Sequence, residues 1–206
     1  ERSFESYERL YQAGADRYLL RHEAVSDELY SKLHPERLKL KNRLQCLEDL
    51  KKIGFQTGCG FMVGAPYQTP RHIAEDLKFI EKFKPDMCGI GPFVPHKDTI
   101  FKNEPSGSAE LTCFLLSIIR LACPNVLLPS TTALGTIDPT GREKGILSGA
   151  NVVMPNLSPV NVRKKYDLYD NKISMGAESA QHIKDLEARM EKIGFKVVYE
   201  RGDIIK

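Results

Sequence analysis

The sequence predicts an α/β fold, part of a (β/α)8 TIM-type barrel with about five parallel strands and flanking helices. Strand-like and helix-like segments alternate along the chain, which is typical of parallel βαβ units. The strand-like segments are short and apolar, as strands covered on both faces are. Polar residues and glycines follow each of them, at the barrel end where such folds carry their chemistry.

Helices are expected where apolar residues recur every three to four positions between a residue that starts a helix and one that ends it. Gly54, for example, ends a segment in which apolar residues recur every third position up to Ile53. The expected helices span residues 2–13, 25–33, 42–53, 70–84, 108–123, 141–148 and 178–193.

Strands are expected at residues 16–21, 56–63, 87–93, 125–128 and 150–154, with 196–199 as a further strand appended at the C-terminal end. Glycines alternate in the second and third strands, so one face of each carries no side chains. Such a face is typical of close approach by a ligand or by another backbone. A tight contact between helix and strand is the alternative.

Composition excludes several classes of protein. The chain has 30 Lys and Arg against 27 Asp and Glu, and this net charge of +3 without a basic stripe argues against nucleic-acid binding. Its apolar stretches are far shorter than the ~18 residues of a membrane span. The five cysteines are widely spaced, so these residues contain no zinc or iron–sulfur motif. Reduced thiols in a cytoplasmic protein, with no metal ligands of its own, are the expectation.

Polar residues at the predicted barrel mouth suggest a binding site. Arg21 and Glu23 leave the first strand two positions apart, so a guanidinium and a carboxylate could point into the mouth together. Arg43 lies near a helix start, where the helix dipole disfavours a cation, which suggests anion binding. Thr131 and Thr132 follow a strand and could bind an anion. The structural alternatives are an ion pair, a solvated arginine and a helix cap.

Long motifs at these strand ends resemble a known superfamily. Residues 17–23 (RYLLRHE), with Asn42-Arg-Leu44 after them, resemble the fourth strand and following helix of radical S-adenosylmethionine enzymes of the biotin-synthase type. Residues 58–66 (GCGFMVGAP) are similar to their fifth strand. Further segments at 86–96, 131–136, 141–143, 149–156 and 166–172 narrow the resemblance to the [FeFe]-hydrogenase maturases of that superfamily. It extends from about residue 1 to about residue 172.

The resemblance implies a full barrel that holds S-adenosylmethionine and a [4Fe–4S] cluster. The cluster reductively cleaves the cofactor to a 5′-deoxyadenosyl radical, which acts on a small iron-containing or sulfur-containing substrate. Glu23 falls where the family binds the cofactor ribose, and Arg43 where it holds the methionine carboxylate. Arg21 falls beside the reacting centre. Other hydrogenase-maturation proteins are the implied partners.

Two further groups of residues follow from the same resemblance. The inner wall of the substrate pocket falls on Met87, Pro92, Val94, Met154, Tyr166 and Tyr169. An anion site at the far end of the barrel falls on Thr131, Thr132 and Ala133. From their types alone, the methionines are expected in the core and the tyrosines in loop packing.

The chain also departs from the family pattern. It lacks the cluster-binding C-x3-C-x2-C and supplies five strands of eight, and its 206 residues fall short of the ~250 of a closed barrel. Tyr67 replaces an expected glycine and Ile100 an expected proline. We therefore expect residues 1–172 to be the C-terminal portion of a radical S-adenosylmethionine barrel, followed by a helix and tail at 173–206. Such a portion would not cleave the cofactor alone, because the cluster belongs to the full-length parent.

Three alternatives remain open. The chain could belong to another biotin-synthase-like enzyme, such as biotin synthase or methylornithine synthase. It could be a non-catalytic half-barrel that serves as a binding or scaffold module. It could also close with fewer strands into a compact α/β domain. A partial barrel exposes strand edges, so we expect self-association or pairing with the missing segment, without a nucleic-acid or membrane partner.

Overall fold

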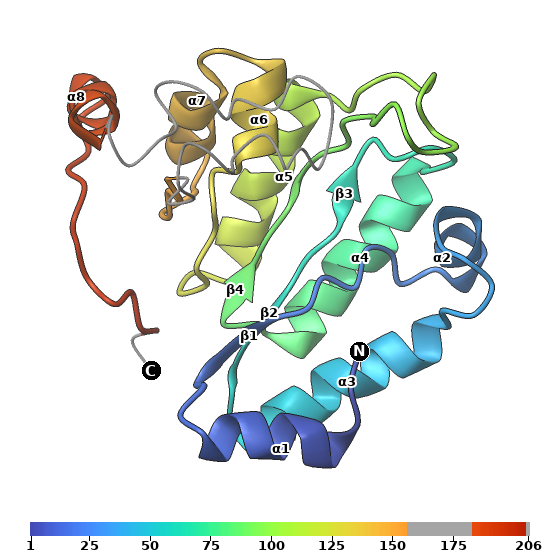
Figure 1. The fold of residues 1–206 in the computed structure, drawn as a ribbon. Coiled ribbons are helices and arrows are strands. Elements are labelled where there is room, and N and C mark those ends of the chain that lie inside the picture. Colours follow the sequence, from blue (N-terminus) through green and yellow to red (C-terminus); the bar gives the residue numbers. More distant parts are fainter. Residues whose placement is uncertain (156–182, 205–206) are drawn as a thin grey trace.

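Parallel strands at the centre of the molecule lie side by side in chain order. This computed structural model describes residues 1–155 and 183–204. One sheet has the order β1–β2–β4, and β3 pairs with β5 beyond it (Figure 1). The strands are β1 (Arg17–Leu19), β2 (Gln56–Cys59), β3 (Met62–Val63), β4 (Met87–Cys88) and β5 (Gly91–Pro92). Single parallel bridges, Met87 to Leu127 and Pro129 to Val152, add two more segments.

The predicted partial barrel is therefore confirmed as a parallel α/β arrangement, although its last two strands are reduced to single bridges. The segments at 125–128 and 150–154 each contribute one bridge residue, Leu127 and Val152, in place of a full strand. The prediction of a strand at 196–199 is wrong, because this segment pairs with no strand in the described structure. The expected domain boundary near residue 172 lies outside the described residues.

Helices begin and end close to the positions that the sequence predicts. They are α1 (Phe4–Gln12), α2 (Asp27–Leu33), α3 (Leu40–Ile53), α4 (Pro70–Phe83), α5 (Ala109–Ala122), α6 (Thr132–Ile137), α7 (Gly141–Leu147) and α8 (Ile183–Lys192). Ser26, Thr69 and Ser108 cap three of them by accepting backbone N–H groups. The short helix α6 was not expected, since a run of Pro, Ser, Thr and Gly resembles a loop.

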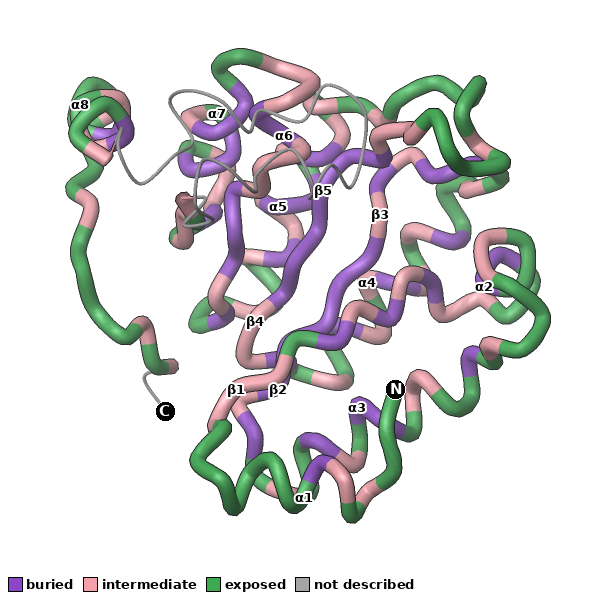
Figure 2. The backbone as a smooth tube through the Cα atoms, viewed as in Figure 1, coloured by how far each residue is buried: buried purple, intermediate pink, exposed green. Residues whose placement is uncertain are grey.

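The side chains on the outer face of the sheet form the core. Cys59 and Phe61 on one strand, and Cys88 and Ile90 on the next, are buried against the flanking helices. Figure 2 shows this burial as purple stretches between β2 and β3 and between β4 and β5. Because side chains alternate along a strand, the glycines between them lie on the opposite, inner face.

The glycines of the inner face have two different environments. A methyl group at Gly60, where φ is 152°, would lie 2.0 Å from the carbonyl oxygen of Gly89 on the neighbouring strand. A methyl group at Gly89 would meet only the carbonyl oxygen of Cys59, at 3.9 Å. The expected close approach of another backbone is thus confirmed at Gly60, whereas Gly89 leaves room on the inner face.

Tyr67, for which the resemblance predicted a glycine, adopts a glycine-like backbone. Its φ is 65°, and its ring is 58% exposed. A side chain in this left-handed region costs roughly 1 kcal/mol. We expect the free energy of unfolding of Tyr67→Gly to be about 1 kcal/mol higher than that of Tyr67→Ala. Both variants lose the ring, but only alanine keeps a side chain in the left-handed region. Urea unfolding of the two variants measures the difference, and equal stabilities would show that this turn carries no strain.

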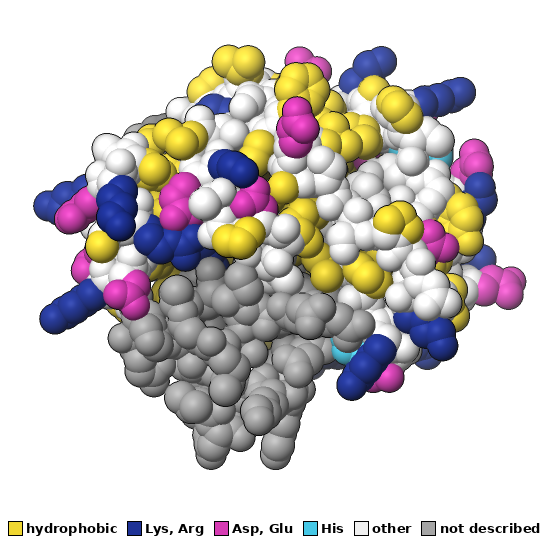
Figure 3. Space-filling view, turned by 90° about the horizontal axis from the view of Figure 1, so that it is seen from above, with side chains coloured by type: hydrophobic (Ala, Val, Ile, Leu, Met, Phe, Trp, Pro, Cys, Tyr) yellow, Lys and Arg dark blue, Asp and Glu magenta, His cyan; other side chains and the backbone are white. Residues whose placement is uncertain are grey.

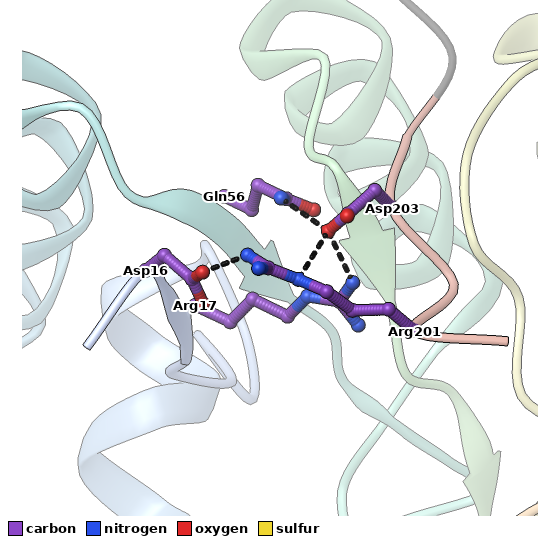
Figure 4. Close-up of polar contacts among 5 residues, drawn as sticks. All are labelled: Asp16, Arg17, Gln56, Arg201 and Asp203. Carbon is purple, nitrogen blue, oxygen red and sulfur yellow. Dashed lines mark hydrogen bonds and ion pairs between the residues drawn. The ribbon is translucent and has the colours of Figure 1, made fainter. Parts of the chain in front are cut away.

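The C-terminal tail crosses the end of the sheet where the strands begin. Asp203 accepts hydrogen bonds from Arg17 Nη2 at 2.6 Å and from Gln56 Nε2 at 2.9 Å, while Arg201 pairs with Asp203 and with Asp16 (Figure 4). These contacts lower the pKa of Asp203, with the hydrogen bonds from Gln56 and Arg17 as the main causes. The tail thus contacts side chains at the start of β1 and β2 without extending the sheet.

A two-pronged ion pair anchors α8 to the rest of the fold. Arg189 donates from Nε and Nη2 to the two carboxylate oxygens of Glu143 on α7, at 2.6 and 2.7 Å. The hydrogen bonds from Arg189 lower the pKa of Glu143. This geometry fixes the direction of α8 where it meets α7.

Candidate functional site

Three predicted site residues, Arg21, Glu23 and Arg43, lie together just beyond β1. Arg21 Nη2 is 3.3 Å from Glu23 Oε2, and Arg43 Nη1 donates to the carbonyl oxygen of Arg21 at 3.2 Å. The first two leave β1 on one face, and the third comes from the first turn of α3. The structure thus joins two arginines and one carboxylate at the carboxyl end of the sheet.

Glu23 is held in an unusual conformation with its carboxylate turned inward. Its φ is 66°, a region that residues other than glycine seldom occupy. Its N–H donates to the carbonyl oxygen of Gly60 at 3.0 Å. Within the described residues, the buried Arg21 Nη2 and Glu23 Oε2 contact each other as an ion pair without hydrogen-bond geometry, and Arg21 Nε is buried without a hydrogen bond. Buried polar atoms normally have partners, so this pair fits a polar ligand with hydroxyl groups.

Arg43 is arranged to hold a carboxylate. Its Nε lies 2.9 Å from the carboxylate of Glu1 and 3.3 Å from the hydroxyl of Tyr30 on α2. Burial lowers the pKa of Arg43, but the hydrogen bond to Tyr30 and the charges of Glu1 and Glu23 outweigh burial and raise it overall. Burial raises the pKa of Tyr30. The guanidinium of Arg43 therefore stays protonated, and it already contacts the carboxylate of Glu1 in this structure.

The residues expected on the pocket wall lie at different places. Met87 pairs with Gly58 near the start of the ladder, and Pro92 pairs with Val63 near its end. They are an odd number of positions apart on one extended segment, so their side chains lie on opposite faces. Val94 is half-buried and Met154 is exposed. The structure does not bring Met87 and Pro92 onto one wall, and Tyr166 and Tyr169 lie outside the described residues.

The threonines of the expected anion site take part in a helix cap. Thr131 Oγ1 accepts the N–H of Leu134 at the start of α6, so the capping alternative is realised. Thr132 Oγ1 accepts a hydrogen bond from Arg142 Nη2 at 3.3 Å, and Ala133 is half-buried. Arg142 is only 1% exposed. Arg142 was not among the residues predicted for the anion site, although it lies in the motif Gly141-Arg-Glu143.

Other features of the described residues lie away from this cluster. Figure 3, seen from above, shows hydrophobic side chains interspersed with charged ones on the end of the molecule where the strands finish. A cavity of about 400 Å³ lies elsewhere, between the segment at 150–155, α8 and the tail, and Met87 and Met190 contribute to its lining. Within the described ranges, no group of three or more His, Cys, Asp or Glu side chains could hold a metal ion.

No helix among the residues that the structure describes is long and apolar enough to cross a membrane.

Comparison with known proteins relates this chain to maturases and to a synthase. No family model matches. The chain is 44% identical over 192 residues to "[FeFe] hydrogenase maturase subunit HydE" of Thermotoga maritima, a match that covers 93% of this chain and 55% of the relative. It is 27% identical over 185 residues to 3-methylornithine synthase of Methanosarcina acetivorans, covering 89% of this chain and 50% of that relative.

Solved structures share the fold. Methylornithine synthase (PylB) matches with a TM-score of 0.78 and 23% identity, over 96% of this chain and 56% of its own. HydG, a maturase of the [FeFe]-hydrogenase, matches with a TM-score of 0.63 and 18% identity, over 92% of this chain and 48% of its own.

The 44% identity over 93% of this chain places it among the radical S-adenosylmethionine proteins of the biotin-synthase-like type, and the parallel strands are those of a TIM-type barrel. Within that class, the chain belongs to the HydE family of [FeFe]-hydrogenase maturases. The chain spans about half the length of the curated relatives it matches.

Proposed function

We propose that this chain forms the S-adenosylmethionine-binding part of a radical enzyme that matures [FeFe]-hydrogenase. The observation that carries the proposal is the cluster of Arg21, Glu23 and Arg43, with buried polar atoms that lack hydrogen bonds among the described residues. A ribose offers two hydroxyl donors to a carboxylate, and the methionine part offers a carboxylate to an arginine. These two demands match the groups that this site presents.

Each residue then has a distinct role. Glu23 accepts hydrogen bonds from the ribose hydroxyls, Arg43 holds the methionine carboxylate, and Arg21 lies beside the reacting centre. When bound, the cofactor supplies an organic radical once an iron–sulfur cluster has reduced it. The sequence contains no C-x3-C-x2-C. We therefore propose that the cluster ligands come from residues outside these 206, and that this chain alone binds the cofactor without cleaving it.

The substrate side of the proposal is a small iron-containing or sulfur-containing molecule. Met87, Val94, Met154, Tyr166 and Tyr169 are proposed to line its path, whereas Pro92, which lies on the opposite face from Met87, does not. Thr131, Thr132 and Ala133 are proposed to bind an anion, with Arg142 nearby as a buried cation. Methylornithine synthase remains the rival within the same class, because it shares this fold.

Cofactor binding tests the proposal directly. Isothermal titration of the 206-residue chain with S-adenosylmethionine should show binding, and Glu23→Gln should weaken it about tenfold, since a hydrogen bond to a charged group is lost. Glu75→Gln removes the same charge from a half-buried side chain on α4, which pairs with Arg71 away from the site, and serves as the matched control. Absence of binding to the unmodified chain, or equal affinities for Glu23→Gln and Glu75→Gln, would contradict the proposal.

A further inference from the structure

We propose that His22 and Asp76 form a buried positioning pair, which holds Arg21 and Glu23 in the conformation that binds S-adenosylmethionine. This inference rests on the proposed function. His22 Nε2 lies 3.3 Å from Asp76 Oδ1, and both side chains are fully buried. His22 stands between the two site residues in the sequence, but its side chain points to the opposite face, towards α4.

The hydrogen bond from Gly60 identifies the tautomer of a neutral His22. The backbone N–H of Gly60 donates to His22 Nδ1 at 3.3 Å, so this nitrogen carries no proton. The proton of a neutral imidazole then sits on Nε2, facing the carboxylate of Asp76. Nδ1 thus accepts the N–H of Gly60 and Nε2 lies against the Asp76 carboxylate, both away from solvent. This arrangement suits a structural support and does not suit an acid–base catalyst, which must reach a substrate.

The pair also fixes the backbone on both sides of Glu23. Asp76 Oδ1 accepts the N–H of Val25 at 2.8 Å, while the N–H of Glu23 donates to the carbonyl oxygen of Gly60. The carbonyl oxygen of Gly60 therefore accepts a hydrogen bond from Glu23, and the N–H of Gly60 donates one to His22. The left-handed backbone of Glu23 lies between these fixed points. Strained backbone persists where its surroundings determine it this closely.

Packing connects the pair to α4. The ring of His22 meets Phe79 edge to face, with centroids 4.8 Å apart, and lies 6.0 Å from Phe61. Phe79 and Asp76 are one turn apart on α4, so this helix supplies both the carboxylate and an aromatic wall. A buried ionic group in apolar surroundings contributes little net stability, because its desolvation offsets the attraction between the charges. We therefore assign the pair a positioning role, in which it holds the strained backbone of Glu23.

The test compares two substitutions of Asp76 in the full 206-residue chain. Asp76→Asn keeps an oxygen that can accept from Val25 and His22, so we expect S-adenosylmethionine affinity within about threefold of the unmodified chain. Asp76→Leu removes every acceptor, and we expect a loss of at least about tenfold. Leu116→Ala, in the core on α5, is the control for lowered stability alone and should leave the affinity of the folded chain unchanged.

A second readout does not depend on the cofactor. Nitrogen NMR of labelled histidine should show His22 as the neutral Nε2–H tautomer, and the amides of Val25 and Gly60 should lose protection from hydrogen exchange in Asp76→Leu but not in Asp76→Asn. Unchanged affinity in Asp76→Leu, or a protonated or Nδ1–H imidazole at His22, would overturn the inference. If the unmodified chain binds no cofactor, the proposed function is wrong, and the tautomer and amide protection alone decide whether the pair positions this backbone.

Discussion

Replacing Gly60 by alanine is expected to destabilise the folded structure strongly. The new methyl group would lie 2.0 Å from the carbonyl oxygen of Gly89 and 2.7 Å from its carbonyl carbon. Both are backbone atoms of the adjacent strand, and neither can rotate away. The φ of 152° at Gly60 adds backbone strain for any other residue.

Relief would require the two strands to move apart, which the core resists. Cys59 and Cys88 are paired across the strands next to the clash, and both are fully buried. Moving them would open packing on the outer face and break the bonds that Gly60 makes to Glu23 and His22. We expect a cost above ~3 kcal/mol, a large share of the 5–15 kcal/mol that stabilises a typical domain.

Gly89→Ala is the matched control, because it adds the same methyl group to the neighbouring strand. Its methyl would meet only one atom within 4 Å, at 3.9 Å, so we expect a change in unfolding free energy of less than ~1 kcal/mol. Circular dichroism during urea unfolding measures both variants. Similar stabilities for Gly60→Ala and Gly89→Ala would show that the two strands are not in close contact at this point.

These two glycines also show the limit of the sequence as a guide to the fold. Their spacing indicated a strand face without side chains of its own, but the same spacing occurs on both strands. Only the register between the strands determines which glycine meets a carbonyl group. The helices were easier to predict, because caps such as Ser26 and Ser108 act within a few residues of their own position.

Elements that depend on distant partners were predicted less well. Helix α6 has six residues and a glycine, and its start depends on space for the Thr131 side chain that Gly91 leaves free on another strand. Leu127 and Val152 lie in apolar segments typical of strands, yet each makes a single bridge. Local pattern identifies an apolar extended segment, but pairing is decided by the neighbouring segment.

The candidate site likewise combines features that local spacing predicts with contacts that only the tertiary structure creates. The spacing of Arg21 and Glu23 was enough to place them on one face. The proximity of Arg43 and Tyr30 is tertiary, since they come from α3 and α2, and for Arg43 it was expected only from the family resemblance. A role for His22 could not be predicted from the sequence, because its partner Asp76 comes from α4, more than 50 residues further along the chain.

Arg43→Met is expected to remove most of the affinity for the carboxylate of S-adenosylmethionine. Methionine keeps much of the apolar stem of arginine but cannot donate a hydrogen bond. Loss of a charge-assisted contact of about 2 kcal/mol corresponds to a roughly 30-fold higher dissociation constant. Arg71→Met removes the same charge from a side chain that is 86% exposed on α4, and it should leave the affinity unchanged.

The ligand offers a second control that separates binding from structure. Arg43 also donates to the carbonyl oxygen of Arg21, so its removal could loosen the site without any effect specific to a carboxylate. Decarboxylated S-adenosylmethionine lacks the group that Arg43 is proposed to hold, and Arg43→Met should weaken its binding less than about threefold. Titration of both ligands into both variants gives the coupling between Arg43 and the carboxylate. Equal losses for the two ligands would assign Arg43 a structural role and leave the methionine carboxylate to another cation.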